Sequence, residues 1–213
     1  GASGMLAAQA AARAQPDGYT VLITTNTTHA ANEHLYKKLP YDPVKDFAPV
    51  TGLGKGGQVL VVAANSSHKS VQELVDYAKK NPGKLNYASS GPGTPYHMAG
   101  ELFKYMAGVD IVHVPHKGSD QARTAVLGHQ VDMMFDAIST IVGQVRAGKL
   151  KAIAPTGKAR STVTPEVPTV AEAGVPGYEA PIWLGLMAPA GTPKPVVEKL
   201  NAEVVKVLNS AEI

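Results

Sequence analysis

Four short segments of the sequence combine hydroxyl side chains, glycines and histidines, the residue types that bind or activate a small anion. They are Thr25–His29 (TNTTH), Ser89–His97 (SSGPGTPYH), Pro115–Gly118 (PHKG) and Asp136–Ser139 (DAIS). Hydroxyl, imidazole and backbone N–H groups donate hydrogen bonds, and such bonds are strong when the acceptor is charged. The candidate ligand-binding residues in or beside these segments are Thr25, Asn26, Thr27, His29, Ser89, Ser90, Gly91, Gly93, Thr94, His97, His116, Lys117, Gly118 and Asp136.

The stretch Asn86–Gly100 (NYASSGPGTPYHMAG) has the features of an anion-binding loop. Thr94 suits the N-cap of a helix and Pro95 its first position. The unpaired N–H groups and the dipole of that helix would then point at an anion. Gly91 and Gly93 would allow close approach of the backbone. Ordinary strand–helix loops favour the same residue types for capping alone, so it is the presence of several such loops that favours a binding site.

Two glycine-rich stretches imitate nucleotide-binding motifs without the required context. Gly52–Gly57 matches G-x-G-x-x-G, but it precedes a predicted strand, whereas that fingerprint follows a strand and opens a helix. Gly143–Lys149 resembles a P-loop, but Leu150 follows it and it lies at the end of a predicted helix. We therefore predict no nucleotide and no other cofactor.

Catalysis and metal binding have little support in the sequence. There are no cysteines, and no G-x-S-x-G motif occurs. Ser90 with His97 is the only local nucleophile–base pair, which keeps a hydrolase acting on a carboxylate or ester as the alternative function. His113 and His116 lack the further ligands that a metal needs. Asp136 either orders a ligand hydroxyl or amine or caps the following helix.

The composition is that of an ordinary soluble protein. Hydrophobic residues make up 44% and charged residues 17% of the 213, and the formal net charge is +3. No apolar run approaches the roughly 20 residues that span a bilayer. The basic excess is small and no Lys/Arg cluster is interleaved with aromatics, so nucleic acid is not a predicted partner.

The order of the predicted elements indicates an α/β protein. From residue 84 to 155, strands alternate with helices of 10–15 residues, which is typical of βαβ units in mostly parallel sheets. One lone apolar strand precedes this alternating segment (Val59–Ala63) and another follows it (Ile182–Met187). They predict an inner domain (56–180) inserted into an outer one (1–55 and 181–213). A helix is also predicted to run through Leu39 up to Pro40, and Ser70 with Glu73 has the spacing of a capping box.

Several long motifs resemble one family along nearly the whole chain. The motifs are PDGYTVLITT, LPYDPVKDFAPVTGL, KNPGKLNYASSGPGTPYHMAGELF, VPHKG, LGHQVDMMFD, RAGKLKAIAPTGKAR, PEVPTVAEAGVPGYE and LMAPAGTPKPVVEKLN. They are similar to the Bug proteins, the TctC-like receptors of tripartite tricarboxylate transport systems. The resemblance implies a two-lobed periplasmic-binding-protein-like fold that closes over a small organic carboxylate without catalysis. It also implies a periplasmic location and membrane transporter subunits as partners, with the loops named above as the ligand site.

The chain departs from the family pattern in three places. His116 stands where many relatives have tyrosine (VPYKG), a change that alters ligand choice or adds a pH-sensitive donor. The sequence begins within a GAGG-like motif, Gly1–Gly4, so a signal peptide and first strand are expected to be missing. The last stretch of the family is expected to be missing as well. We therefore expect a truncated outer lobe whose exposed apolar surface could support an oligomer.

Two questions stay open at this level. A sensory or interaction module would share the receptor fold, and fold alone does not separate it from a transport receptor. Dicarboxylates, amino acids and aromatic acids could all use the same carboxylate cradle, so the ligand is not identified.

Overall fold

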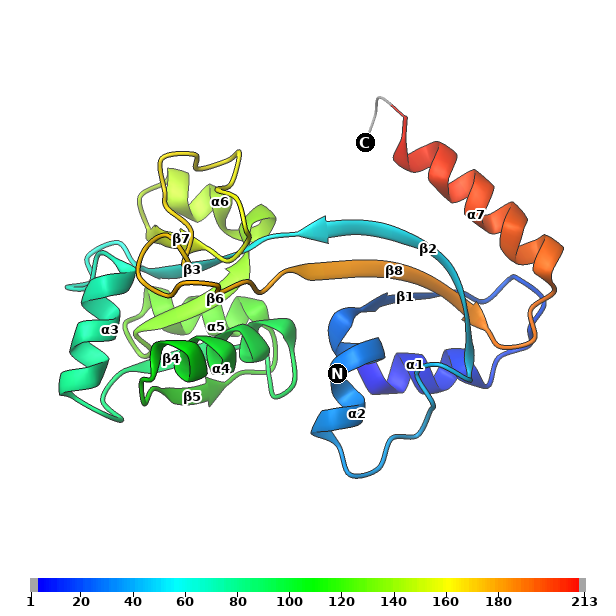
Figure 1. The fold of residues 1–213 in the computed structure, drawn as a ribbon, viewed down its shortest axis with the longest axis horizontal. Coiled ribbons are helices and arrows are strands. Elements are labelled where there is room, and N and C mark those ends of the chain that lie inside the picture. Colours follow the sequence, from blue (N-terminus) through cyan, green and yellow to red (C-terminus); the bar gives the residue numbers. More distant parts are fainter. Residues whose placement is uncertain (1–3, 211–213) are drawn as a thin grey trace. The chain divides into compact units, whose positions relative to one another are not determined.

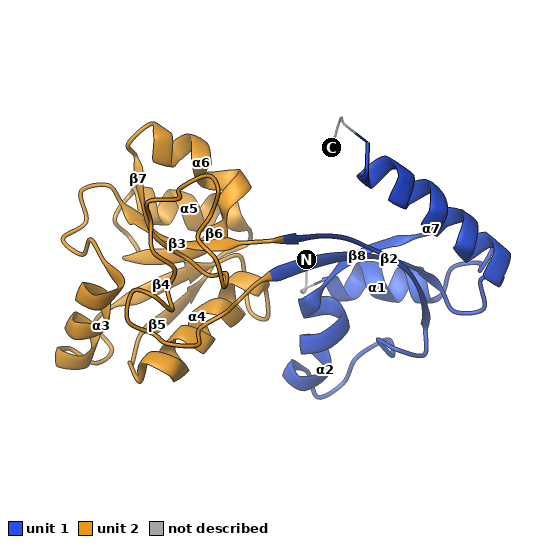
Figure 2. Ribbon diagram, turned by 45° about the horizontal axis from the view of Figure 1, so that its top comes forward, with its two compact units in different colours: residues 1–55, 182–213 blue, residues 56–181 orange. Residues whose placement is uncertain are grey.

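The computed structural model describes residues 4–210, and these form two compact units (Figure 2). Unit 1 contains the chain up to Lys55 and again from Ile182 onward, and unit 2 contains Gly56–Pro181. Gly1–Ser3 of the GAGG-like motif lie outside the described residues. Unit 2 is therefore one continuous stretch of sequence, whereas unit 1 is assembled from two.

Unit 1 is built on a three-stranded sheet in the order β1-β8-β2. β1 and β8 are antiparallel, with Leu22 opposite Met187 and Thr25 opposite Leu184. The elements of unit 1 are α1 (Met5–Ala12), β1 (Leu22–Thr25), the π-helical turn η2 (Thr27–Ala31), α2 (Asn32–Leu35), β2 (Phe47–Gly56), β8 (Ile182–Pro189) and α7 (Lys194–Leu208) (Figure 1).

Each face of this sheet packs against a different helix, because successive strand residues point to opposite faces. On one face, Ala8 and Ala11 of α1 pack with Leu22, Tyr41 and Phe47. The other face presents Val50, Leu186 and Ala188 to apolar residues of the amphipathic helix α7, namely Val197, Leu200 and Val204.

The predicted helix through Leu39 is wrong at its C-terminal end. Helix α2 ends at Leu35, and Tyr36 is extended with φ −119° and ψ 129°. The extended segment carries Leu39 into contact with the α1–β1 core. Burial of an apolar side chain thus overrides helix propensity, which is a weak local preference.

Unit 2 is built on a five-stranded sheet in the order β5-β4-β6-β3-β7 (Figure 1). Its elements are β3 (Gln58–Ala63), α3 (Val71–Lys80), β4 (Asn86–Ser89), α4 (Pro95–Ala107), β5 (Val112–Pro115), α5 (Ser119–Leu127), β6 (Met133–Ala137), α6 (Ile138–Arg146) and β7 (Leu150–Pro155).

The sheet of unit 2 is mixed, which corrects the expectation of mostly parallel pairing. β4 is parallel to both β5 and β6, but β3 is antiparallel to both β6 and β7. Strands β4, β5, β6 and β7 therefore run in one direction, and β3 is antiparallel to them. β3 differs because it continues from β2 of unit 1 after a single residue, Gly57, rather than following a helix.

Helices cover both faces of this sheet. Leu60, Phe135 and Tyr178 belong to a core that also includes residues of α3 and α4. Val61 and Met134 belong to the core on the opposite face, with residues of α5 and α6. Among the residues described, no helix has the length and apolar character needed to cross a membrane.

The predicted capping box at the start of α3 is present in modified form. Ser70 Oγ accepts the Glu73 N–H at 3.2 Å, as expected. Glu73 Oε2, however, accepts the N–H of Lys69 at 2.6 Å rather than that of Ser70. The Glu73 carboxylate therefore bonds one residue before the N-cap instead of at the N-cap itself.

Candidate functional site

The loops after β4, β5 and β6 lie at one edge of the unit 2 sheet, because these strands are parallel. Ser89 is paired with Pro115, and the His116 N–H donates to the Ser89 carbonyl at 3.0 Å. Asp136 lies near the end of β6, the neighbour of β4 on the other side. The predicted residues from Ser89 to Asp136 are thus brought together, whereas Thr25, Asn26, Thr27 and His29 belong to unit 1.

The Ser89–Thr94 loop uses most of its polar groups to hold its own conformation. The buried Ser89 Oγ accepts the Gly91 N–H at 3.1 Å and lies 2.6 Å from His113 Nε2. Thr94 is the N-cap of α4 as predicted, and its hydroxyl donates to the Gly91 carbonyl at 2.7 Å. The Gly93 N–H donates to His97 Nδ1 at 3.0 Å. The amides of Gly91 and Gly93 are therefore both paired within unit 2.

The two glycines of this loop are required by backbone geometry. Gly91 has φ 125° and Gly93 has φ 74°, values that residues with a Cβ rarely adopt. A Cβ on Gly91 would also lie 3.4 Å from the His116 carbonyl. The positive φ values thus require glycine at both positions, independently of access to a ligand.

Two histidine rings lie against this loop. His97 and His113 have ring centroids 4.1 Å apart, and His113 also stacks on Tyr87 at 4.9 Å. Burial, and then the proximity of His97, lower the pKa of His113 to about 4. Burial likewise lowers the pKa of His97. Both rings are therefore neutral at pH 7.

Asp136 is fully buried and paired inside unit 2. Its Oδ2 accepts bonds from Arg123 Nε at 3.0 Å and Nη2 at 2.8 Å. Its Oδ1 accepts the Ala137 N–H at 2.8 Å and the Thr140 hydroxyl at 3.3 Å. Both carboxylate oxygens are therefore engaged inside unit 2, and Asp136 is not the N-cap of α6, because that position is Ala137.

Sequence reasoning missed three residues at this edge. Arg123 is the cation that neutralises Asp136. Tyr96 lies in the first turn of α4, near Ser119 and Ala137, and burial raises the pKa of its hydroxyl. Gln58 is buried and donates through Nε2 to the Ala180 carbonyl at 2.9 Å, while its Oε1 has no partner in the described structure. An acidic residue ending an apolar strand signals a buried cation, but neither Tyr96 nor Gln58 gives such a signal.

The loop after β5 is less engaged than its neighbours. His116 Nδ1 lies 3.0 Å from the Val114 carbonyl, to which it can only donate, so in the neutral ring Nε2 is left as an acceptor. Lys117 is exposed, and its N–H donates to Gln121 Oε1 at 3.3 Å. The carbonyl of Gly118 accepts the Ala122 N–H of α5 at 3.2 Å. The Lys117 ammonium is thus placed to attract an anion without a fixed contact.

The Thr25–His29 segment of unit 1 contains buried polar atoms without partners. The Thr24 hydroxyl and His29 Nδ1 are 2.5 Å apart. Burial lowers the pKa of His29, so the ring is neutral at pH 7. Thr27 Oγ1 and His29 Nε2 are both buried, and neither has a hydrogen-bond partner in the residues that the structure describes. An unpaired buried polar group is unfavourable by about 1–3 kcal/mol, so this segment is suited to receive a polar ligand.

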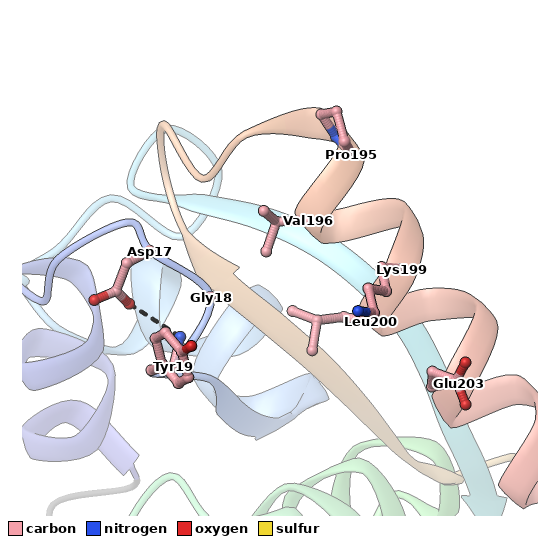
Figure 3. Close-up of a pocket in the computed structure, with 8 residues that line it drawn as sticks. All are labelled: Asp17, Gly18, Tyr19, Pro195, Val196, Lys199, Leu200 and Glu203. Carbon is pink, nitrogen blue, oxygen red and sulfur yellow. Dashed lines mark hydrogen bonds between the residues drawn. The ribbon is translucent and has the colours of Figure 1, made fainter.

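A separate groove in unit 1 contains none of the predicted site residues. It measures about 480 Å³ and is lined by Asp17, Gly18, Tyr19, Pro195, Val196, Lys199, Leu200 and Glu203 (Figure 3). Asp17 accepts the Tyr19 N–H at 2.9 Å, and the Tyr19 side chain is 94% exposed. Its walls are mainly apolar and two of its charged residues are acidic, which does not suit a carboxylate.

The geometry does not favour the chemical alternatives. His97 Nδ1 accepts the Gly93 N–H and so does not serve as a base for Ser90. The buried Ser89 does contact His113, but its side chain has no solvent access for a substrate. No group of three or more His, Asp or Glu side chains in residues 4–210 could hold a metal ion.

Solved structures of solute-binding proteins share this fold. "R. palustris Rpa4515 with adipate" has a TM-score of 0.94 and 37% identity and covers 100% of this chain and 71% of its own. "MatC (Rpa3494) from Rhodopseudomonas palustris with bound malate" has a TM-score of 0.90, 39% identity and 72% of its own chain covered. The periplasmic binding protein BugD has a TM-score of 0.90 and 35% identity, again with 71% of its chain covered. The fold is therefore that of these solute-binding proteins.

The family follows from the sequence comparisons. The family model "Tripartite tricarboxylate transporter family receptor" (TctC) matches residues 1–213, and the chain belongs to this family. A protein encoded in the tcbD-tcbE intergenic region of Pseudomonas sp. (strain P51) is 38% identical over 100% of this chain, which covers 63% of that protein. BugT of Bordetella pertussis is 32% identical over 100% of this chain and 66% of its own length. The chain thus spans about two thirds or less of these curated relatives, and the expected oligomer stays a prediction.

Proposed function

We propose that this chain is part of a periplasmic receptor that captures a small organic carboxylate and delivers it to membrane transporter subunits, without catalysis. The observation that carries the proposal is the likeness, over the whole chain, to two solved structures that hold adipate and malate. Both ligands are small dicarboxylates. The family model describes receptors of a tripartite transporter, which supplies the partner.

The unpartnered groups of unit 1 support a carboxylate as the ligand. If the Thr24 hydroxyl donates to His29 Nδ1, the neutral ring carries its hydrogen on Nε2. His29 Nε2–H and the Thr27 hydroxyl are then two donors that lack acceptors in the described structure. A carboxylate supplies two acceptor oxygens, and bonds to a charged acceptor contribute about 1.5–3 kcal/mol each.

Unit 2, considered by itself, offers a different set of groups for a polar ligand. The Gln58 amide is held by its Nε2–H bond to Ala180, so that its unpartnered oxygen can accept but not donate. An acceptor of this kind suits a ligand hydroxyl or ammonium rather than a carboxylate. Lys117 supplies positive charge at the same edge of the sheet. We therefore expect a hydroxy- or amino-substituted acid to bind more tightly than the unsubstituted acid of the same length.

The proposal is tested by calorimetric titration with malate, succinate and adipate, together with a thermal-shift measurement. A ligand at about 100 times its Kd adds about 2.7 kcal/mol of stability. The same titrations are made with any longer natural polypeptide that contains these 213 residues. Absence of binding by all three acids in both proteins would refute the receptor function for small dicarboxylates.

Matched variants locate the binding groups. Thr27→Val removes the unpartnered hydroxyl and keeps the shape, so affinity falls about tenfold, corresponding to about 1.4 kcal/mol. Glu203→Gln, in the groove of Figure 3, is the control and leaves affinity unchanged. If the two variants changed ligand affinity equally, Thr27 would not be a ligand-binding residue.

A further inference from the structure

The Ser89–Thr94 loop is supported by histidines from two different elements of unit 2. Gly93, in the loop, donates its N–H to Nδ1 of His97, in the first turn of α4, at 3.0 Å. Ser89, at the start of the loop, is in contact with His113 of β5, whose Nε2 lies 2.6 Å from Ser89 Oγ. The two rings lie against each other, with centroids 4.1 Å apart.

The contact of His97 with Gly93 is possible in only one protonation state of the ring. A backbone N–H can only donate, so Nδ1 must be unprotonated and the ring hydrogen must lie on Nε2. Protonation of Nδ1 would bring two donors face to face. The Ser89 contact is more tolerant, because a hydroxyl can both donate and accept. Of the two histidine contacts, the one between His97 and Gly93 is therefore the one that protonation would break.

The groups around His97 determine how easily the ring takes up a proton. On its own helix, Glu101 Oε1 lies 3.9 Å from His97 Nε2 and favours the charged ring, while Lys104 opposes it. Glu101 is shared with the Tyr87 hydroxyl at 2.7 Å and with Lys104 at 3.0 Å.

The groups on β5 act in one direction. From that side the His113 ring lies tilted against the His97 ring, and a charge on either ring penalises a charge on the other. His116 adds a further unfavourable interaction to a charged His113. Together with burial, these groups keep the pair neutral over the neutral pH range.

We infer that His97 is a positioning residue, which in its unprotonated form holds Gly93 and with it the Ser89–Thr94 loop, so that ligand affinity falls when His97 is protonated. The inference rests on the proposed function, because the loop matters only if it contributes to ligand binding. It concerns how the loop is held and requires no contact between His97 and the ligand.

The matched variants are His97→Asn and His97→Ala. The amide oxygen of asparagine can stand in for Nδ1 as the acceptor but does not titrate, whereas alanine offers no acceptor. Malate affinity is measured by calorimetry from about pH 7.5 down to about pH 4.5, a range that spans the ordinary histidine pKa. The pH dependence that comes from malate itself is common to all the proteins and cancels when the variants are compared with the wild type.

The expected result has two parts. The wild type loses about tenfold more affinity than His97→Asn across this range, the loss of one hydrogen-bonded anchor, and His97→Ala is weak at every pH. In ligand-free wild type, the NMR signal of the Gly93 amide shifts with the same midpoint, below pH 6.5, as the His97 ring. Parallel affinity curves for wild type and His97→Asn, or a Gly93 signal that does not follow the ring, would overturn the inference.

The Gly93 measurement needs neither a ligand nor a variant. If malate, succinate and adipate all fail to bind at neutral pH, the proposed function is refuted, while Gly93 still shows whether His97 holds the loop. If malate binds and the Gly93 signal is independent of pH, only the positioning role is refuted.

Discussion

The Ser89–Thr94 loop of unit 2 and the Thr25–His29 segment of unit 1 have similar compositions but use their polar groups in opposite ways. In the first, the Ser89 and Thr94 hydroxyls and the Gly93 amide all bond within unit 2. In the second, Thr27 Oγ1 and His29 Nε2 are buried without partners. A run of small polar residues can therefore be either a self-supporting scaffold or a set of groups awaiting a ligand, and substitutions separate the two.

The largest effect is expected at Asp136, which belongs with the self-supporting groups. Asp136→Asn removes the charge that Arg123 neutralises in the interior, which destabilises by about 3–5 kcal/mol. The control is Asp120→Asn. Asp120 is the other partner of Arg123, but its side chain is 97% exposed, so its loss has an effect of about 1 kcal/mol or less. Urea unfolding of both variants measures the difference, and similar values would show that Asp136 is not the essential partner.

Ser89→Ala is expected to destabilise by about 1–3 kcal/mol, because it leaves the Gly91 amide and His113 Nε2 without their shared partner. Ser90→Ala is the matched control in the same loop, and its effect stays within about 0.5 kcal/mol. Thermal unfolding of the two proteins gives the comparison. If Ser90→Ala proved the more harmful, the hydrogen-bond network described for this loop would be wrong.

A smaller effect is expected from pH through His113. Burial and the neighbouring His97 lower the pKa of His113 to about 4 in the folded chain, against an ordinary value of 6.5. The unfolded chain therefore binds the proton more readily, and the contribution to stability is complete above pH 6.5 and is lost as the pH falls toward 4. His113→Gln, which keeps a polar atom near Nε2, should reduce this pH dependence by about 1 kcal/mol after allowance for solvent screening. Unfolding curves that depend on pH equally in both proteins would contradict the assignment.

The smallest effect on stability is expected at Thr27. Thr27→Val removes a hydroxyl that has no partner in the described structure, so the free energy of unfolding without ligand stays within about 0.5 kcal/mol or rises slightly. Thr24→Val, which removes the hydroxyl that is paired with His29 Nδ1, is expected to destabilise by about 1 kcal/mol. If Thr27→Val lowered the free energy of unfolding more than Thr24→Val did, the Thr27 hydroxyl would be a structural group and not one that awaits a ligand.

The periodic parts of the fold were predictable from sequence. The alternation from β4 to β7 follows from apolar runs of strand length and from amphipathic helices between them. The N-caps Ser70 and Thr94 followed from side-chain chemistry at fixed spacing. The direction of β3 was not predictable, because a lone apolar strand carries no sign of which neighbours it will pair with.

The candidate site was predictable only as a set of loops. Parallel strands place their carboxyl ends at one edge, and this brings Ser89 and His116 together. Whether a given polar atom is engaged depends on residues far away in sequence. Gln58 is held by Ala180 across 122 positions, and no local pattern announces that bond.

The pairing of β1 with β8 has a consequence for the order in which the chain can fold during synthesis. Leu22 of β1 can pair only after Met187 of β8 has been synthesised, because the two residues are opposite each other in the antiparallel pair. Such a contact forms late and slowly, because residues 23–186 make up its loop. All of unit 2 emerges from the ribosome before Met187 does, so its sheet can be complete while Val21–Thr25 still lacks a partner strand. Until then, this segment rich in β-branched residues is an unpaired strand, a type of segment that can pair with another chain.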